Sequence, residues 1–569
     1  MLRRRRLSSK GDTAARTVRE DEGERKECRY RPMRLLAGCL FAAAGCILFA
    51  GCLHHEPPAD LVIINFTEPE SLDPAIVTGI AEMRLTKALF EGLLRLDGTN
   101  ARPSPGLAER WEISPQGTIY TFYLRSNLAW STGEPLTTAD VVYSWRRALD
   151  PATASDYAAQ LFCLKNAEAF YNGKIKDPAA VGIRALDSRR LEVELEHPLA
   201  FFPDVCCMPV TAVVPRQIID REGDRWLSAR PLPVSGPYEL EAWRLNDKVR
   251  LHKNPRYWDA SHTQSDVVDM LPIGSPNVAL NLYETGLADI VWDKDLIPVE
   301  LQEVLAKRPD FHAYDYLGTY FYRFNVTRKP LDDARVRRAF ALATDRERII
   351  RKLTHGGEKA AFHFVPDGTA NYQSPEGLPF DPARARQLLA EAGFPGGRGF
   401  PRLQFAFYSA ASGGAKLQGD LAIELQQMWR DGLGIETELR QIERKIFMGV
   451  QSRLEFDVCA SSWIADYDDA NTFLDLFTSN SGNNRTGWKN AHYDQLLQAA
   501  NSQTDVHQRA QLFREAESLL VTEEAPIVPV YFYTGFNYFD PAKIEGIWQN
   551  LLDEHPVQSI RRIKARQTH

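Results

Sequence analysis

The chain has 569 residues, of which 44% are hydrophobic and 25% charged, and its formal net charge is −7. These values exclude a disordered, collagen-like or polytopic membrane chain, and the length predicts roughly three or four lobes. Residues 1–51 carry a charge of +6 and residues 52–569 a charge of −13. An acidic body without a basic stripe argues against nucleic acid as a partner.

An export signal is predicted near the N-terminus. Arg31 and Arg34 precede an apolar, uncharged segment, 35–53, that contains Ala50-Gly51-Cys52. This layout resembles the lipobox of bacterial lipoproteins, which implies that residues 1–51 are a leader and that Cys52 carries the lipid. The alternative is an uncleaved transmembrane anchor, because about 18 apolar residues can span a bilayer. Both interpretations place the body outside the cytoplasm, in the periplasm or cell envelope.

Residues 1–32 are long and mixed in charge for a signal peptide. We expect translation to begin at Met33, which would make 1–32 a spurious extension; a disordered cytoplasmic tail is the alternative. Residues 52–60 are predicted to be a polar tether between the lipid and the body.

Strands and helices alternate along the body, which predicts an α/β fold with mixed sheets. Residues 61–66 have the pattern of a buried strand. One helix is expected from Ala139 with Thr138 as cap, and another is expected to be opened by Asp332/Asp333. A third is expected from Pro382, between an Asp381 cap and a Gly393 stop. A further helix is expected to end at 432–434 and to be followed by a half-buried strand, 435–439.

No catalytic motif is found in the sequence: it has no G-x-S-x-G, Walker A, H-E-x-x-H or Rossmann glycine pattern. The acidic run 466–469 does not fit a calcium loop, because Asn471 stands where such a loop needs glycine. We therefore expect neither enzyme activity nor a cofactor or metal. Four cysteines of the body, which have no zinc-type spacing, allow one disulfide that the sequence does not assign: Cys163, Cys206, Cys207 and Cys459.

Several segments, in order along nearly the whole mature chain, resemble the peptide-type (family 5) extracellular solute-binding proteins of bacterial ABC importers, and among these the oligopeptide-binding proteins. The most specific segment is 130–145, WSTGEPLTTADVVYSW. The other matching segments are 68–74, 89–93, 105–111, 120–125, 236–238, 254–258, 325–337, 388–393 and 463–467.

The resemblance implies a periplasmic-binding-protein-like fold of type II, in which two hinged lobes close on a ligand and an additional domain is present. By alignment, lobe I comprises 57–90, 199–317 and 531–569, the extra domain 91–198, and lobe III 318–530. The implied partners are a peptide ligand, an ABC permease with its ATPase, and the membrane through the lipid anchor. The protein is expected to act as a monomer.

The resemblance also implies the ligand site. A peptide binder of this kind holds the ligand backbone between strands and pairs the ligand ammonium with a carboxylate. The positions that match the family are Thr78, Gly79, Ile80, Ser462, Trp463, Ile464 and, for the ammonium, Asp466. We also expect Tyr157 to line the site. The alternatives are that Asp466 only caps the next turn and that Trp463 is a core aromatic.

Two features of the family pattern are missing. Relatives carry a disulfide between the positions of Gly318 and Ile464, and some hold the ligand C-terminus with a basic residue at the position of Ala460. Ligand length and C-terminal preference therefore stay open. The alternatives are a binder of the same fold for a dipeptide, sugar, opine or nickel chelate, or a cleft enzyme such as a peptidase.

Overall fold

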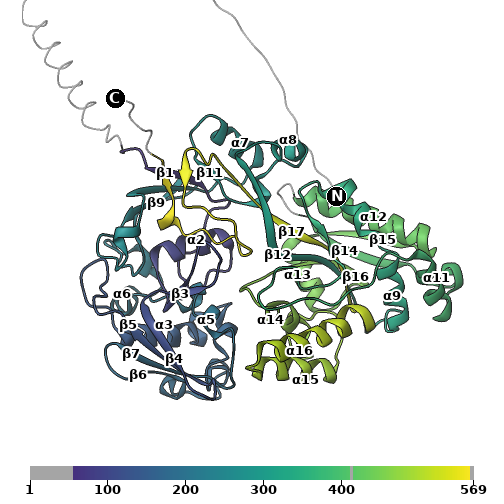
Figure 1. Cartoon of the computed structure of the whole chain (residues 1–569), viewed down its shortest axis with the longest axis horizontal. Coiled ribbons are helices and arrows are strands. Elements are labelled where there is room, and N and C mark those ends of the chain that lie inside the picture. Colours follow the sequence, from purple (N-terminus) through teal and green to yellow (C-terminus); the bar gives the residue numbers. More distant parts are fainter. Residues whose placement is uncertain (1–55, 410–413, 564–569) are drawn as a thin grey trace, which may run out of the picture. The chain divides into compact units, whose positions relative to one another are not determined.

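Two long antiparallel strands, β12 (Phe311–Phe324) and β17 (Ile527–Phe539), form the centre of the structure. The computed structural model describes residues 56–409 and 414–563, and Figure 1 shows the two strands side by side. Both strands are rich in tyrosine and phenylalanine and are buried over most of their length. Such runs favour a strand that is covered on both faces.

These strands belong to an 11-stranded mixed sheet. The strand order is β15 (Thr437–Glu443), β14 (Leu403–Ser409), β16 (Val458–Ile464), β12, β17, β11 (Ile290–Val291), β1 (Leu61–Ile64), β10 (Val267–Leu271), β9 (Lys248–Lys253) and β8 (Tyr238–Arg244), with β13 (Lys359–Ala360) also paired to β17. β14 pairs in parallel with β15 and β16, whereas β12 pairs antiparallel with β16 and β17. The predicted α/β class with mixed sheets is confirmed.

The pairing of β12 with β17 is interrupted between Asp315 and Thr319. Before the interruption, β12 packs in a core with Phe536 and Tyr538. After it, the same strand enters a different core with α9 (Ala334–Leu342) and α12 (Gly414–Leu433). Irregularities of this kind break the ladder and bend the strand. The chain therefore passes from one hydrophobic core to another at residues 316–318.

A further hydrophobic core surrounds α3 (Thr138–Ala148) and is called the α3 core below. It also contains Trp145 and Phe122, which are fully buried. Its four-stranded antiparallel sheet has the order β4 (Ala108–Ile113), β5 (Ile119–Leu124), β7 (Arg190–Glu194) and β6 (Ile183–Ala185).

The expected cap of α3 was wrong by one residue. Thr137 is the N-cap, and its N–H donates to Oδ2 of Asp140 at 2.8 Å. Asp140 stands at the third helical position from Thr137, which completes a capping box. The side chain of Thr138 is buried and donates to the carbonyl of Asp187 instead.

Two other predicted helix starts are confirmed. Asp333 caps α9 by accepting a hydrogen bond from the N–H of Arg335 at 2.8 Å. Asp381 caps α11 (Pro382–Glu391) by accepting from the N–H groups of the first turn. β15 begins at Thr437, two residues later than expected, because the N–H of Ile435 bonds back to the last turn of α12 at the carbonyl of Trp429.

Candidate functional site

Most of the residues that the sequence analysis selected line one cavity of about 500 Å³. Its walls come from α2 (Ile80–Leu89) and the segment after it, from 204–212, from β16 and the turn after it, and from 552–558. A cavity of this size is in the ~300–1,000 Å³ range of ligand pockets. The selected residues in the wall are Thr78, Ile80, Tyr157, Ser462, Trp463, Ile464 and Asp466. Gly79 is the N-cap of α2 and does not line the cavity.

One edge of β16 is open beside this cavity. β12 pairs with one side of β16 from Val458 to Ile464, whereas β14 pairs with the other side only at Val458 and Cys459. The N–H of Ala465 donates to the carbonyl of Leu317 on β12. Backbone groups alternate in direction along a strand, so those of Ser462 and Ile464 point to the other side. Within the described residues that side has no strand partner beyond Cys459, and an extended peptide can add there.

Asp466 follows β16 by two residues and is partly buried. The hydroxyl of Tyr157 donates to its Oδ1 at 3.5 Å. Burial raises the pKa of Asp466 to about 6, and the Tyr157 bond opposes this shift. No cation of the described residues contributes to that pKa. The arrangement suits a carboxylate whose charge is compensated only when a ligand cation arrives.

The capping alternative for Asp466 is not what the structure shows. The next helix is α14 (Asn471–Leu474), and the carboxylate that accepts from the N–H of Asn471 belongs to Asp469. Asp466 instead donates its backbone N–H to Oγ1 of Thr472 at 3.2 Å. Its carboxylate remains in the cavity wall.

Beyond Ile80, helix α2 supplies lining residues that the sequence analysis missed, among them Met83, Arg84 and Lys87. Ile80, Met83, Arg84 and Lys87 recur at helical spacing and all line the cavity. Arg84 pairs with Asp553 at 3.0 Å, and Lys87 pairs with Glu554 at 2.5 Å. The spacing could have revealed the helix face. The partners lie more than 450 residues further along the chain, so no local signal connects them.

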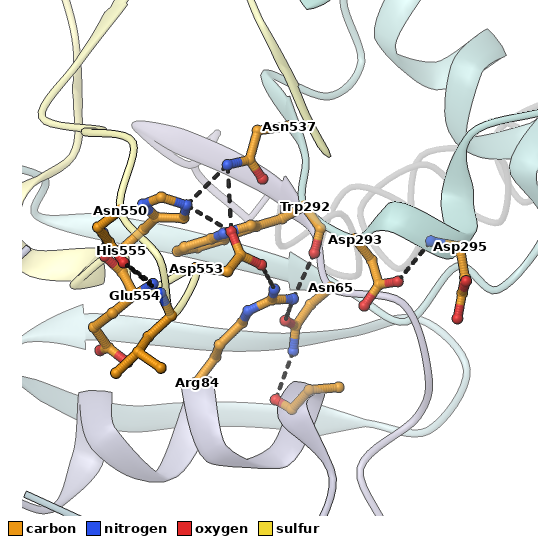
Figure 2. Close-up of polar contacts among 12 residues, drawn as sticks. Asn65, Arg84, Trp292, Asp293, Asp295, Asn537, Asn550, Asp553, Glu554 and His555 are labelled. Carbon is orange, nitrogen blue, oxygen red and sulfur yellow. Dashed lines mark hydrogen bonds and ion pairs between the residues drawn. The ribbon is translucent and has the colours of Figure 1, made fainter. Parts of the chain in front are cut away.

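Asp553 is the centre of a buried polar network on this wall (Figure 2). Its carboxylate accepts from Nε2 of His555 at 2.7 Å, from Arg84 and from the hydroxyl of Tyr314. The side-chain amide of Asn537 lies 2.8 Å from the same Nε2. Burial acts to raise the pKa of Asp553, but the bond from His555 and the positive charge of Arg84 outweigh it and hold the pKa below its ordinary value.

Glu91, another lining residue that we missed, is anchored within the wall. Its carboxylate accepts from the hydroxyl of Tyr257 at 2.5 Å and from Nε1 of Trp258 at 2.6 Å. Burial raises its pKa, while Arg95, 3.8 Å away, opposes the shift. These contacts satisfy Glu91 without a ligand.

The positions at which relatives carry a disulfide are neighbours here. Gly318 and Ile464 stand directly opposite each other on β12 and β16. Cys163, Cys206, Cys207 and Cys459 are free thiols, and all but Cys163 are buried. In the described ranges no group of three or more His, Cys, Asp or Glu side chains is arranged to hold a metal ion.

The predicted leader, the start at Met33 and the lipidation site Cys52 lie outside the described residues. Across residues 56–409 and 414–563, none of the helices combines the length and the apolar character needed to cross a membrane.

Comparison with known proteins places the chain in a family. Residues 102–485 match the family described as bacterial extracellular solute-binding proteins, family 5. The periplasmic oligopeptide-binding protein OppA of Salmonella typhimurium is 35% identical, over 84% of this chain and 88% of that protein. A probable deoxycholate-binding periplasmic protein of Escherichia coli, YgiS, is 34% identical over 82% and 87%.

A solved structure also resembles the chain in its fold. Haemophilus influenzae OppA, in complex with the peptide RPPGFSPFR, superposes with a TM-score of 0.75 and 28% identity, covering 90% of this chain and 100% of that one. The predicted two-lobe architecture of type II is thereby confirmed. Both OppA proteins are named periplasmic oligopeptide-binding proteins.

Proposed function

The chain belongs to family 5 of the bacterial extracellular solute-binding proteins, and we propose that it captures oligopeptides in its cavity and delivers them to an ABC importer. The observation that carries the proposal is the open edge of β16 next to Asp466 in one cavity. An edge strand binds a peptide backbone of any sequence. A carboxylate without a cation at the end of that edge suits the ammonium group that every unblocked peptide has.

We propose that the two lobes named in the sequence analysis close on the ligand. Lobe I, with 78–80, and lobe III, with 462–466, would close on the ligand by bending β12 and β17 at their interruption near 316–318. The extra domain would contribute Tyr157. The domain limits that we propose are those of the sequence analysis: 57–90, 199–317 and 531–569 for lobe I, 91–198 for the extra domain, and 318–530 for lobe III.

We propose that the mature protein is a monomer held at the membrane surface by a lipid on Cys52. In this position it would present loaded peptide to a permease and ATPase complex. The function that we propose is binding and transfer, without turnover of the ligand. Incubating purified protein with peptides and following their masses tests this last point, because a peptidase would shorten them.

Mass spectrometry of ligands released by denaturing protein purified from its own cells tests the main proposal. We expect short peptides with free amino groups. A second candidate, a solute without an amino group, is favoured by the relative named as a probable deoxycholate-binding protein. Titration with deoxycholate and with a tripeptide separates the two. Tight binding of deoxycholate with no binding of any tripeptide would overturn the peptide assignment.

A further inference from the structure

The wall of the cavity has more carboxylates than cations. Its basic side chains are Arg84, Lys87, Arg95 and His555, and its carboxylates are Glu91, Asp204, Asp466, Asp553 and Glu554. Each of the Lys and Arg cations is already paired with a carboxylate of the same wall: Arg84 with Asp553 at 3.0 Å, Lys87 with Glu554 at 2.5 Å, and Arg95 with Glu91 at 3.8 Å. Two carboxylates of this wall, those of Asp466 and Asp204, form no ion pair with a cation of the described residues.

Asp204 belongs to the short helix α5 (Phe202–Val205), which packs in the α3 core. The backbone N–H of Asp204 donates to the carbonyl of Phe201 at 2.9 Å. No side chain of the described residues donates a hydrogen bond to its carboxylate, and none of their cations forms an ion pair with it. Burial raises the pKa of Asp204 to about 7, the negative charges of Asp469 and Asp468 add to the shift, and Arg102 opposes it. The carboxylate is therefore poorly compensated by the protein itself.

An aromatic contact links the segment that contains Asp204 to the segment that contains Asp466. Phe201 stacks on Tyr467 with ring centroids 4.6 Å apart and an interplanar angle of 9°. Asp204 follows Phe201 by three residues, and Asp466 immediately precedes Tyr467. The stack thus holds the two segments together, and both residues line the same cavity. Asp204 also lines a second cavity, together with Arg102, Asp468 and Asp469.

Two carboxyl groups without a cationic partner among the described residues, in one partly buried cavity, favour a ligand with two positive charges, because each cation stabilises the ionised carboxylate by an ion pair. We propose that Asp204 is a specificity residue that selects peptides with a lysine or arginine side chain at the first or second position. This proposal rests on the peptide-binding function: the ligand ammonium pairs with Asp466 and the basic side chain reaches Asp204. A neutral side chain of equal length leaves Asp204 unpaired.

Calorimetric titration of the full mature chain with matched tripeptides tests the proposal. The peptides carry lysine, Nε-acetyl-lysine or norleucine at position one or two and alanine elsewhere. For wild type we expect the lysine peptide of at least one series to bind about 10-fold or more tightly than both neutral analogues, since a charge-assisted bond contributes about 1.5–3 kcal/mol and each ~1.4 kcal/mol is tenfold. Asp204→Asn should reduce that preference to less than about threefold.

Asp468→Asn is the matched control. Asp468 adds negative charge near Asp204 but is absent from the ligand cavity, and its Oδ1 accepts from the N–H of Ala370 at 2.8 Å. This variant should keep most of the lysine preference. Thermal melting checks the fold, and removal of an uncompensated carboxylate in Asp204→Asn should not lower the melting temperature of the unliganded protein.

Each remaining outcome counts against the proposal. If Asp204→Asn weakens the binding of the lysine and norleucine peptides equally, Asp204 affects closure of the lobes and does not select a basic side chain. If wild type binds all the peptides alike, the specificity fails while the peptide function stands. If wild type binds none of them, both fail. If Asp468→Asn abolishes the preference as fully as Asp204→Asn does, the selection comes from the general field of the acidic residues and the assignment to Asp204 falls.

Discussion

The hydroxyl of Tyr157 donates to Oδ1 of Asp466 at 3.5 Å and so joins two residues that are 309 positions apart. Within residues 56–409 and 414–563, this contact is the single hydrogen bond from a side chain that affects the pKa of Asp466, which burial raises to about 6. A nearby cation strongly stabilises the charged form of such a buried carboxylate. The first two predictions follow from that state.

Asp466→Asn keeps the shape of the side chain and removes its charge. Truncating one partner of a desolvated ion pair costs about 2–5 kcal/mol, so a peptide with a free amino group should bind about 30-fold more weakly or worse. An N-acetylated peptide should bind wild type poorly, and the mutation should add little further loss, because both changes remove the same contact. Calorimetry on the four combinations measures this coupling. Equal affinity of wild type for the free and acetylated peptides would remove Asp466 from the ammonium role.

The affinity for free-amine peptides should depend on pH. Because the pKa of Asp466 in the folded, unliganded protein is raised to about 6, the ion pair needs a pH above that value, and affinity should fall as pH drops through 6. The stability of the unliganded protein should change in the opposite sense, falling as pH rises from about 4 to 6, because the folded state binds the proton more tightly than the unfolded state. Asp204 also titrates near 7, so the titrations are repeated in Asp204→Asn. If the affinity of Asp204→Asn for free-amine peptides did not change as pH drops through 6, the prediction would be contradicted.

Ligand should make the particle more compact. If β12 and β17 bend near 316–318 and the ligand binds the closed form better, it shifts the population towards closure. Small-angle scattering should show a smaller radius of gyration with peptide than without. Asp466→Asn at the same peptide concentration is the control and should remain closer to the unliganded curve. Tight binding with an unchanged radius would argue against two closing lobes.

Gly318 and Ile464 should accept a disulfide. They form a pair without backbone hydrogen bonds between them, in which Cα atoms are about 4.5 Å apart, and this is within the range for a disulfide. The double variant Gly318→Cys/Ile464→Cys should oxidise and gain about 2–4 kcal/mol over its reduced form. Gly318→Cys alone should be destabilised, because a Cβ there would lie 2.9 Å from Cδ2 of Tyr533. Thiol titration and melting under oxidising and reducing conditions measure both effects. Persistence of two extra thiols after oxidation would count against the pairing.

Cys52→Ser should abolish lipid labelling and leave the precursor unprocessed, if the segment ending in Ala50-Gly51-Cys52 is a lipobox. Metabolic labelling with a fatty acid and fractionation of membranes measure this. Because one acyl chain binds a membrane weakly and lipoproteins carry several, wild type should stay in the membrane fraction. A processed, membrane-bound Cys52→Ser protein would favour another kind of anchor.

The sequence by itself determined the class of the fold and several of its element boundaries. Asp333 and Asp381 cap their helices as predicted, because a cap depends on hydrogen bonds to residues two or three positions away. The error at Thr138 also has a local origin: Thr137 and Thr138 are adjacent candidates, and the position of Asp140 decides between them. The ordered resemblance to one family pointed to the strand and the aspartate that now lie in one cavity.

Only the tertiary structure decided which charges of that cavity are compensated. Arg84 and Asp553 are 469 residues apart, and their pairing depends on the way that α2 packs against the C-terminal segment. Asp204 resembles any other acidic residue in the sequence. Only the placement of its neighbours shows that no cation of the described residues forms an ion pair with it and that Arg102 acts on it from further away. Ion pairing over such separations depends on packing and distance rather than on spacing along the chain. The sequence therefore pointed to most of the residues that line the candidate cavity but not to the ion pairs within it.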